Sequence, residues 1–170
     1  MTRYVALLRG VNLGKRQLRM ADLRRIAAEL GLDDPSTFIA SGNLLFASGK
    51  KEPALKKELE KALADHMGAP VRVMIRTAGE MAAVVEANPF AGQPGNRVVA
   101  IFLDDAPPKD AAEDAKNQQD ERIALGQREI YVHYPQGQGP SKLAIPAAAT
   151  GTARNMNSVA KIADLLKGNA

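Results

Sequence analysis

The sequence predicts an α/β protein built from two ferredoxin-like halves, each an antiparallel or mixed β-sheet with helices packed on it. Three observations predict this class. Two runs that are almost continuously apolar, at 4–9 and 98–103, are typical of buried inner strands. Each run is followed by the same order of elements, helix-strand-strand-helix, which is the order of the split βαβ unit. A segment rich in Gly and Pro, at 91–96, separates the two sets of elements.

The first half is expected to span residues 1–90. Its helices are indicated by apolar residues at helical spacing, and Thr77 with Glu80 forms the pattern in which each side chain caps a helix start. Residues 41–43 are typical of a turn between two short strands. The elements expected here are strands at 4–9, 37–40, 44–47 and 71–76 and helices at 20–30, 53–67 and 77–88.

The second half is expected to span residues 97–170. Its predicted elements are strands at 98–103, 123–125 and 130–134 and helices at 109–119, 141–148 and 159–166. No strand is expected between the last two helices, so this half would lack the final strand of the unit. No repeat of individual residues relates the two halves, and their similarity rests on the order of elements alone.

The composition excludes several classes of protein. A chain of 170 residues has the size of one compact unit. It has no Cys, which excludes disulfides and thiolate chemistry and fits a reducing compartment. No apolar run reaches the length of a membrane-spanning helix, and the N-terminus enters a strand without a signal-peptide pattern. We therefore expect a cytoplasmic protein that has no membrane partner.

Positive charge is concentrated near the N-terminus. The chain carries a formal charge of +4, from 23 Lys and Arg and 19 Asp and Glu. Residues 1–25 hold seven of the basic residues and one acidic residue, Asp22, so this segment carries +6 and the remainder −2. Arg24 and Arg25 fit the exposed face of a helix, but the basic residues of the loop at 15–19 do not. The segment favours an anionic partner, either a small ligand or nucleic acid.

Polar residues also gather before the last predicted helix. Arg154, Asn155 and Asn157 lie within four positions, and a helix start offers unpaired N–H groups and positive potential. A helix cap explains one Asn but not all three residues. We therefore expect them to line a pocket with the loop at 9–15 or the turn at 41–43. As a surface residue, Arg154 is expected to change stability by only about 0.5 kcal/mol when replaced by Ala.

The glycine loop after the first strand resembles a phosphate-binding P-loop, but its spacing is wrong. Three residues separate Gly10 from Gly14, where a P-loop has four, and Arg16 stands where Ser or Thr would bind Mg²⁺. A nucleoside triphosphatase is therefore not expected. Two interpretations stay open: backbone N–H groups with Asn12 and Lys15 cradle an anion, or the glycines only turn the chain.

No motif identifies a catalytic group. Ser158 and Lys161 form an S-x-x-K pattern, but the partner motifs of the enzymes that use it are reversed in order or absent. We expect Ser158 to belong to the helix start and Lys161 to be exposed. The motifs contain no His or carboxylate that would act as a general base, so whether the protein is an enzyme stays open.

No metal site or cofactor is indicated either. His66 and His133 are isolated, and no spacing of His, Asp and Glu builds a metal site. Asp104 and Asp105 could bind Mg²⁺ at the end of a strand, but a loop before Pro107 accounts for them.

Six short motifs occur in an order that resembles a known family. They are RGVNLG at 9–14, SGN at 41–43, RT at 76–77, NPF at 88–90, SKL at 141–143 and TARNMNS at 152–158. Together they resemble the bacterial family catalogued as domain of unknown function 1697, over nearly the whole chain. That family usually has Trp at the position of Met156 and Thr at the position of Ser158. The resemblance implies two ferredoxin-like halves and implies no activity.

The function predicted first is recognition of a small anionic ligand, phosphorylated ligands included, in a cleft between these motif loops. The arginines would bind the charge, the asparagines would orient the ligand, and the lysines would add positive charge. The ligand-binding residues expected are Arg9, Asn12, Lys15, Ser41, Asn43, Arg76, Lys142, Arg154, Asn155 and Asn157.

Two alternatives stay open. The basic N-terminal segment could bind nucleic acid weakly and without sequence preference, because no aromatic stacking platform is present. The protein could instead be structural or dimeric, with motif residues that cap helices and satisfy buried backbone. The sequence does not indicate an oligomeric state.

Overall fold

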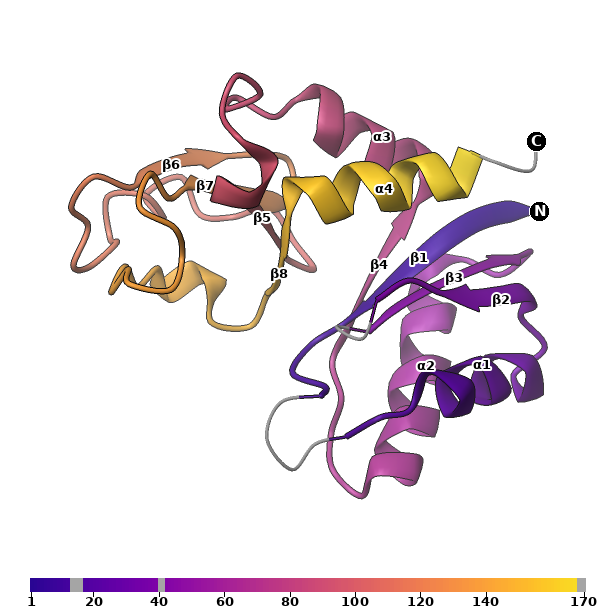
Figure 1. Cartoon of the computed structure of the whole chain (residues 1–170). Coiled ribbons are helices and arrows are strands. Elements are labelled where there is room, and N and C mark those ends of the chain that lie inside the picture. The colour runs from indigo at the N-terminus through magenta and orange to yellow at the C-terminus, as the bar shows by residue number, and fades with distance from the viewer. Residues whose placement is uncertain (13–16, 40–41, 168–170) are drawn as a thin grey trace. The chain divides into compact units, whose positions relative to one another are not determined.

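The structure is a computed structural model that describes residues 1–12, 17–39 and 42–167. Its chain divides into two compact units, Met1–Glu80 with Asp164–Ala170 and Met81–Ala163. Within the described residues, each unit contains one four-stranded antiparallel sheet, and the predicted pair of ferredoxin-like halves is confirmed (Figure 1).

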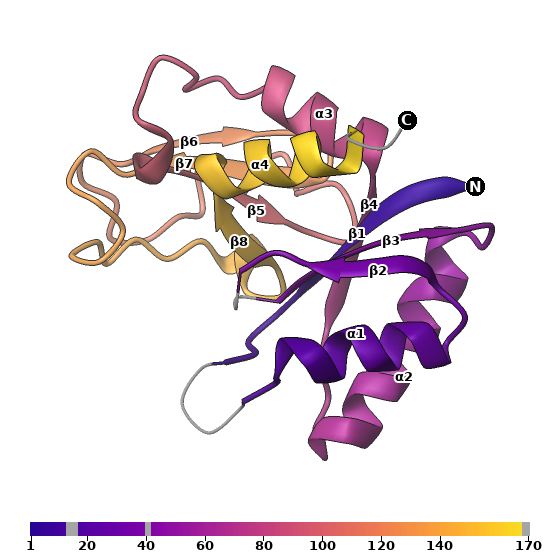
Figure 2. The same cartoon turned by 45° about the vertical axis from the view of Figure 1, so that its right-hand side comes forward.

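The first sheet has the strand order β2-β3-β1-β4. Its strands are β1 (Thr2–Leu8), β2 (Asp33–Thr37), β3 (Asn43–Ser48) and β4 (Val73–Thr77), and its helices are α1 (Met20–Glu29) and α2 (Glu52–Met67). This is the order of the ferredoxin-like unit. The two helices cover the same face of the sheet, where Leu23 of α1 and Leu55 and Leu59 of α2 pack against Ala6 and Leu8 of β1 (Figure 2).

Gly42 fixes the turn before β3. Its φ is +88°, in the left-handed region, and a Cβ there would lie 2.7 Å from the Val11 Cγ2. Only glycine fits such a close approach without displacing a neighbour. The Leu8 N–H donates to the Gly42 carbonyl at 2.9 Å, so the turn is held against the end of β1.

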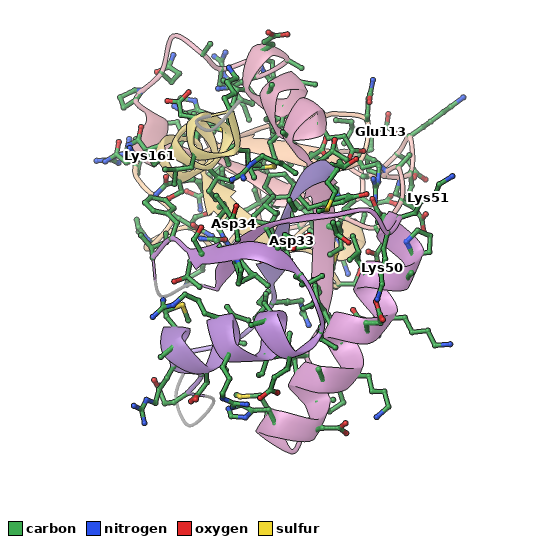
Figure 3. All side chains as sticks on the ribbon, turned by 90° about the vertical axis from the view of Figure 1, so that its right-hand side faces the viewer. Asp33, Asp34, Lys50, Lys51, Glu113 and Lys161 are labelled. Carbon is green, nitrogen blue, oxygen red and sulfur yellow. The ribbon has the colours of Figure 1, made fainter. Side chains whose placement is uncertain are left out.

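The second strand begins earlier than the sequence predicted. The prediction was 37–40, whereas β2 is Asp33–Thr37. The Phe38 N–H already bonds the Asn43 carbonyl, so the chain turns immediately after Thr37. Asp33 and Asp34 are both exposed on this edge strand (Figure 3). Because Asp has a low β-propensity, the sequence does not predict a strand at these positions. Charged side chains on an edge discourage pairing with another chain.

The second sheet repeats the topology of the first, with the order β6-β7-β5-β8. Its strands are β5 (Val98–Phe102), β6 (Arg122–Leu125), β7 (Glu129–His133) and β8 (Thr152–Asn155). The expectation that this half lacks its last strand was wrong, because β8 pairs with β5. The strand is short, and its sequence, TARN, has no apolar alternation that would predict it.

The helices of the second half differ most from the prediction. Residues 109–114 form successive turns, and the predicted helix at 141–148 is reduced to a 3₁₀ turn, Pro146–Ala148. Ala111 is the buried residue of the first segment, and so little apolar surface cannot hold a helix on a sheet. The remaining helical elements are α3 (Ala78–Glu86), a 3₁₀ turn at Gly95–Arg97 and α4 (Met156–Lys167).

Candidate functional site

Arg9 and Arg72 face each other at the end of the first sheet. The ladder between β1 and β4 places Leu8 opposite Val73, and the Arg9 N–H extends it by donating to the Arg72 carbonyl at 2.9 Å. Directly opposite residues project from the same face, with Cβ atoms about 5 Å apart. Both side chains are exposed. The register therefore places two arginines next to each other on one face of the sheet.

Two further predicted residues share this face of the sheet. Side chains alternate along a strand, so Arg76, four residues after Arg72, points to the same side. Asn43 pairs with Leu7 and lies there as well. The structure thus brings Arg9, Asn43 and Arg76 to the sheet face that is opposite α1 and α2. Arg76 is buried, with 1% of its surface exposed, and its Nη1 donates to the Ile75 carbonyl at 2.9 Å.

Asn12 organises the loop that follows Arg9. Its Oδ1 accepts a hydrogen bond from the Leu18 N–H at 2.7 Å, which ties the two ends of the loop together. Asn12 has a φ of +59° and Gly10 a φ of +70°, so the chain turns sharply here. Lys15 in this loop and Ser41 before Gly42 were also predicted ligand residues, and both lie outside the described residues.

Asn43 has a clear structural contact. The side chain is fully buried, and its Nδ2 donates to the Phe38 carbonyl at 2.9 Å across the turn. This bond holds the connection between β2 and β3, which is the role expected of an Asn in a turn.

In the second unit, Arg154 lies in strand β8 and not in the loop expected from the sequence. The side chain is buried, with 7% exposed, so its description as a surface residue was wrong. Its Nη1 donates to the Thr152 Oγ1 at 2.7 Å and to the Ala153 carbonyl at 2.9 Å. Burial lowers the pKa of the guanidinium to about 10, and the group still carries its charge at neutral pH.

The side chains of the two neighbouring asparagines have different contacts. Asn155 caps the helix, because its Oδ1 accepts from the Ser158 N–H at 2.9 Å. Asn157 is exposed, and its side chain lies over Gly95, where a Cβ would come within 2.0 Å of the Asn157 Oδ1. Ser158 lies in the first turn of α4, and Lys161 is exposed, as the sequence predicted (Figure 3).

Lys142 lines a cavity of about 240 Å³ in the second unit. The cavity is also lined by Gln119, Asp120, Glu121, Tyr134, Gln136, Gly137, Pro140 and Ser141. Lys142 is the member of this set that the sequence had assigned to a ligand site. Its neighbours were missed because they come from three separate segments, and single-sequence patterns do not report which loops meet.

Arg72 was also missed by the sequence analysis. A local signal exists, because Arg72 alternates with apolar residues at the start of a predicted strand. Its importance follows only from the pairing with Arg9, which is 63 positions away, and pairing of that range is not visible in periodicity.

The two histidines and the pair Asp104 and Asp105 were also considered as metal ligands. His66 Nε2 lies 3.8 Å from an Asp22 carboxylate oxygen, and the buried His133 ring lies 5.8 Å from the Phe90 ring. Asp104 and Asp105 line a second cavity of about 240 Å³. Over residues 1–12, 17–39 and 42–167, no group of three or more His, Asp and Glu is arranged to hold a metal ion.

Comparison with known proteins adds the family. No curated protein matches the chain. The structure is similar to that of the conserved bacterial protein SP0830 from Streptococcus pneumoniae, with 28% sequence identity and a TM-score of 0.83, over 98% of this chain and 99% of that chain. No helix in the described part of the chain is long and apolar enough to cross a membrane. The family described as "Protein of unknown function (DUF1697)" matches residues 1–131, and the chain therefore belongs to this family.

Proposed function

We propose that the protein binds a small anionic ligand, a phosphate-bearing molecule above all, and that Arg9 and Arg72 hold the charge of that ligand. The observation that carries this proposal is the direct cross-strand pairing of the two exposed arginines. Two arginines that project from the same face at directly opposite positions can both bind one anion placed between them. A guanidinium group also matches the oxygen atoms of phosphate in pairs.

The adjoining loop supports the same ligand class. Asn12 closes this loop on Leu18, and tight turns with positive φ often direct successive backbone N–H groups toward one point. The predicted contributions of Lys15 and Ser41, and of Lys142, Arg154, Asn155 and Asn157 in the second unit, stay predictions. The chain has no Cys, and we expect it to act in the cytoplasm.

Nucleic acid is the second candidate for this basic surface. Ferredoxin-like sheets that bind RNA stack bases on exposed aromatic residues of their inner strands. Here Tyr4 of β1 and Phe46 of β3 are buried and stack on each other, with ring centroids 5.6 Å apart. Without a stacking platform, nucleic-acid binding would rest on phosphate contacts and would fall steeply with added salt. We therefore favour the small ligand.

The test compares Arg72→Ala and Arg9→Ala with Arg122→Ala, which removes an exposed strand arginine of the second unit. Isothermal titration calorimetry would measure binding of inorganic phosphate, pyrophosphate and a panel of sugar phosphates. We expect each of the first two variants to weaken binding at least about tenfold, and Arg122→Ala to leave it unchanged.

Two results would contradict the proposal. One is that no phosphate-bearing probe binds the wild-type protein at millimolar concentration. The other is equal weakening by all three variants. If a single-stranded RNA binds more tightly than every small probe, and Arg72→Ala abolishes that binding, the nucleic-acid alternative replaces the small ligand.

A further inference from the structure

The cavity of the second unit contains charges of both signs, and we propose that it binds a small zwitterion that carries an ammonium and a carboxylate group, a free α-amino acid. The residues that carry the argument are Gln119, Asp120, Glu121, Tyr134, Ser141 and Lys142. This site is separate from the Arg9 and Arg72 pair, and neither proposal depends on the other.

The negative wall of the cavity centres on Glu121. This carboxylate is buried, with 6% of the residue exposed, and its two oxygens accept from different donors. The Ser141 hydroxyl donates to Oε2, and the Gln119 N–H donates to Oε1 at 2.6 Å. These hydrogen bonds, the one from Ser141 first, hold the pKa of Glu121 below its ordinary value. Glu121 is therefore ionised at neutral pH, and neutral donors rather than a cation stabilise its charge.

Tyr134 lies beside this carboxylate and stays a neutral phenol. Burial, together with the charge of Glu121, raises the pKa of Tyr134 above its ordinary value. A neutral phenol can donate a hydrogen bond and also accept one. Tyr134 can therefore bind either end of a zwitterion.

Lys142 and Asp120 supply the exposed charges of the cavity. Both line it, and within the described part of the chain neither forms an ion pair with another residue. The Lys142 ammonium is thus available to a ligand carboxylate, and the Asp120 carboxylate to a ligand ammonium. Gln119 and Gln136 add amide groups, which both donate and accept.

The walls of the cavity are braced before any ligand binds. Arg97 Nη1 donates to the Pro135 carbonyl at 3.1 Å. The Gly137 N–H donates to the Tyr134 carbonyl at 2.9 Å, and the Ser141 N–H to the Gln138 carbonyl at 3.1 Å. A loop held by its own hydrogen bonds loses little freedom on binding, which favours affinity for a small molecule.

Charge and size together select the ligand class. A simple anion would meet the carboxylates of Asp120 and Glu121, and a simple amine would meet the ammonium of Lys142. A zwitterion satisfies both signs. The volume of about 240 Å³ is below the range of about 300–1,000 Å³ typical of pockets for drug-sized ligands, so the molecule must be small.

The same geometry argues for binding and against catalysis by Ser141. Its hydroxyl donates to Glu121, as the nucleophile of a hydrolase donates to its base. The other oxygen of the same carboxylate accepts from the Gln119 N–H, so both oxygens are held as hydrogen-bond acceptors. In this proposal Ser141 holds Glu121 in place, and the cavity serves as a recognition site.

The experiment titrates the 170-residue chain with the common α-amino acids by isothermal titration calorimetry. For each amino acid that binds, the matching amine without the carboxylate and the matching acid without the ammonium are titrated as well. We expect at least one amino acid to bind with a millimolar or smaller Kd, and both truncated analogues to bind at least about tenfold more weakly.

Two variants with matched controls locate the binding. Lys142→Met and Asp120→Asn should each weaken binding of that amino acid at least about tenfold. Lys109→Met and Asp110→Asn change exposed residues of the same unit outside the cavity and should leave the Kd unchanged. All four residues are exposed, so the variants should keep the wild-type melting temperature.

Three outcomes would overturn the proposal. The first is that no amino acid binds at about 10 mM, a concentration at which even weak specific sites fill. The second is an amine or an acid that binds as tightly as the amino acid. The third is a Kd that Lys142→Met or Asp120→Asn leaves unchanged.

Discussion

Arg76 and Arg154 occupy equivalent positions in the two sheets. Each is the second-last residue of the strand that pairs with the first strand of its unit, β4 with β1 and β8 with β5. Arg76 pairs with Val5, and Arg154 pairs with Ala100. In each arginine Nη1 donates to the carbonyl of the preceding residue at 2.9 Å. The two halves therefore share a feature at the level of single residues, which the sequence analysis did not find.

The similarity continues into the next element. The residue after each arginine ends the strand and caps a helix. Thr77 Oγ1 accepts from the Glu80 N–H at 3.1 Å, while Glu80 Oε1 accepts from the Thr77 N–H at 2.8 Å. Asn155 caps α4 through Ser158. A strand, an arginine, a capping residue and a helix thus follow one another in both halves.

The first prediction concerns the stability contribution of these arginines. Arg154→Ala and Arg76→Ala should each lower the free energy of unfolding by about 3 kcal/mol, because truncation of a buried side chain leaves a cavity and removes its hydrogen bonds. Arg122→Ala, at an exposed strand position, should change it by less than about 0.5 kcal/mol. Urea unfolding followed by circular dichroism measures all three. A cost for Arg154→Ala as small as that of Arg122→Ala would return Arg154 to the group of surface ligand residues.

The second prediction concerns the helix caps. Thr77→Ala and Asn155→Ala should each cost about 1 kcal/mol, which is the typical effect of removing a capping side chain. Asn155→Asp keeps the acceptor and adds a negative charge that favours a helix N-terminus, so it should be nearly neutral. The same urea measurement applies. If Asn155→Asp destabilises the protein as much as Asn155→Ala, the cap is not the reason why this residue matters.

The sequence predicted the elements whose signals are local and strong. The continuous apolar run of β1 and the helical spacing of Leu55, Leu59 and Leu63 were sufficient, because β1 is buried on both of its faces and the three leucines are fully buried in the core under one of them. The capping pair of Thr77 and Glu80 was predicted for the same reason: both partners lie within four positions, and the structure confirms it.

The predictions that were wrong or missing concern features that depend on partners far away in the sequence. β8 is a strand only because Ala100 and its neighbours in β5 pair with it, and nothing in residues 152–155 alone indicates this. The helix at 109–119 is the opposite case, because it was predicted and the structure does not contain it. Its residues suit a helix, but beyond Ala111 they offer little apolar surface to bury. The pair Arg9 and Arg72 was missed because their proximity is set by sheet register.

The third prediction tests the close approach at Gly42. Gly42→Ala should cost about 2–4 kcal/mol, because it adds left-handed backbone strain to a clash with Val11. Gly31 has a φ of +79° and open space around it, so Gly31→Ala should lower the free energy of unfolding by about 1 kcal/mol. Gly49→Ala has neither constraint and should be close to neutral. Thermal melting would rank the three variants, and any other order would mean that the turn relaxes around the added methyl group.

The fourth prediction concerns alkaline pH. Burial, and then the charge of Glu129, raises the pKa of Tyr131 to about 12, and its hydroxyl donates to the Val84 carbonyl at 2.8 Å. The folded protein thus favours the neutral phenol more than the unfolded chain, where the pKa is about 10. Its contribution to stability is complete below pH 10 and is lost as the pH rises from 10 to 12.

Tyr131→Phe separates this effect from other alkaline titrations. The variant should lose about 1 kcal/mol at pH 8, where the hydrogen bond is intact, and should be less sensitive to pH between 10 and 12. Phenolate absorbance and chemical unfolding at each pH measure the two quantities. An unchanged alkaline profile in Tyr131→Phe would assign the loss of stability to another group.

The fifth prediction concerns acid pH and the bond between Glu121 and Ser141. The folded-state pKa of Glu121 is lowered from 4.5, so ionised Glu121 stabilises the fold above pH 4.5, and that contribution disappears as the pH falls below it. Ser141→Ala removes the largest cause of the shift and should raise the pKa of Glu121, while the Gln119 N–H keeps it partly lowered. Ser36→Ala, at an exposed position of β2, should leave it unchanged. Side-chain carboxyl chemical shifts measured by NMR against pH would report the pKa directly. If Ser141→Ala leaves the Glu121 titration where it was, the hydroxyl does not stabilise the carboxylate, and the negative wall of the cavity must be held by the backbone alone.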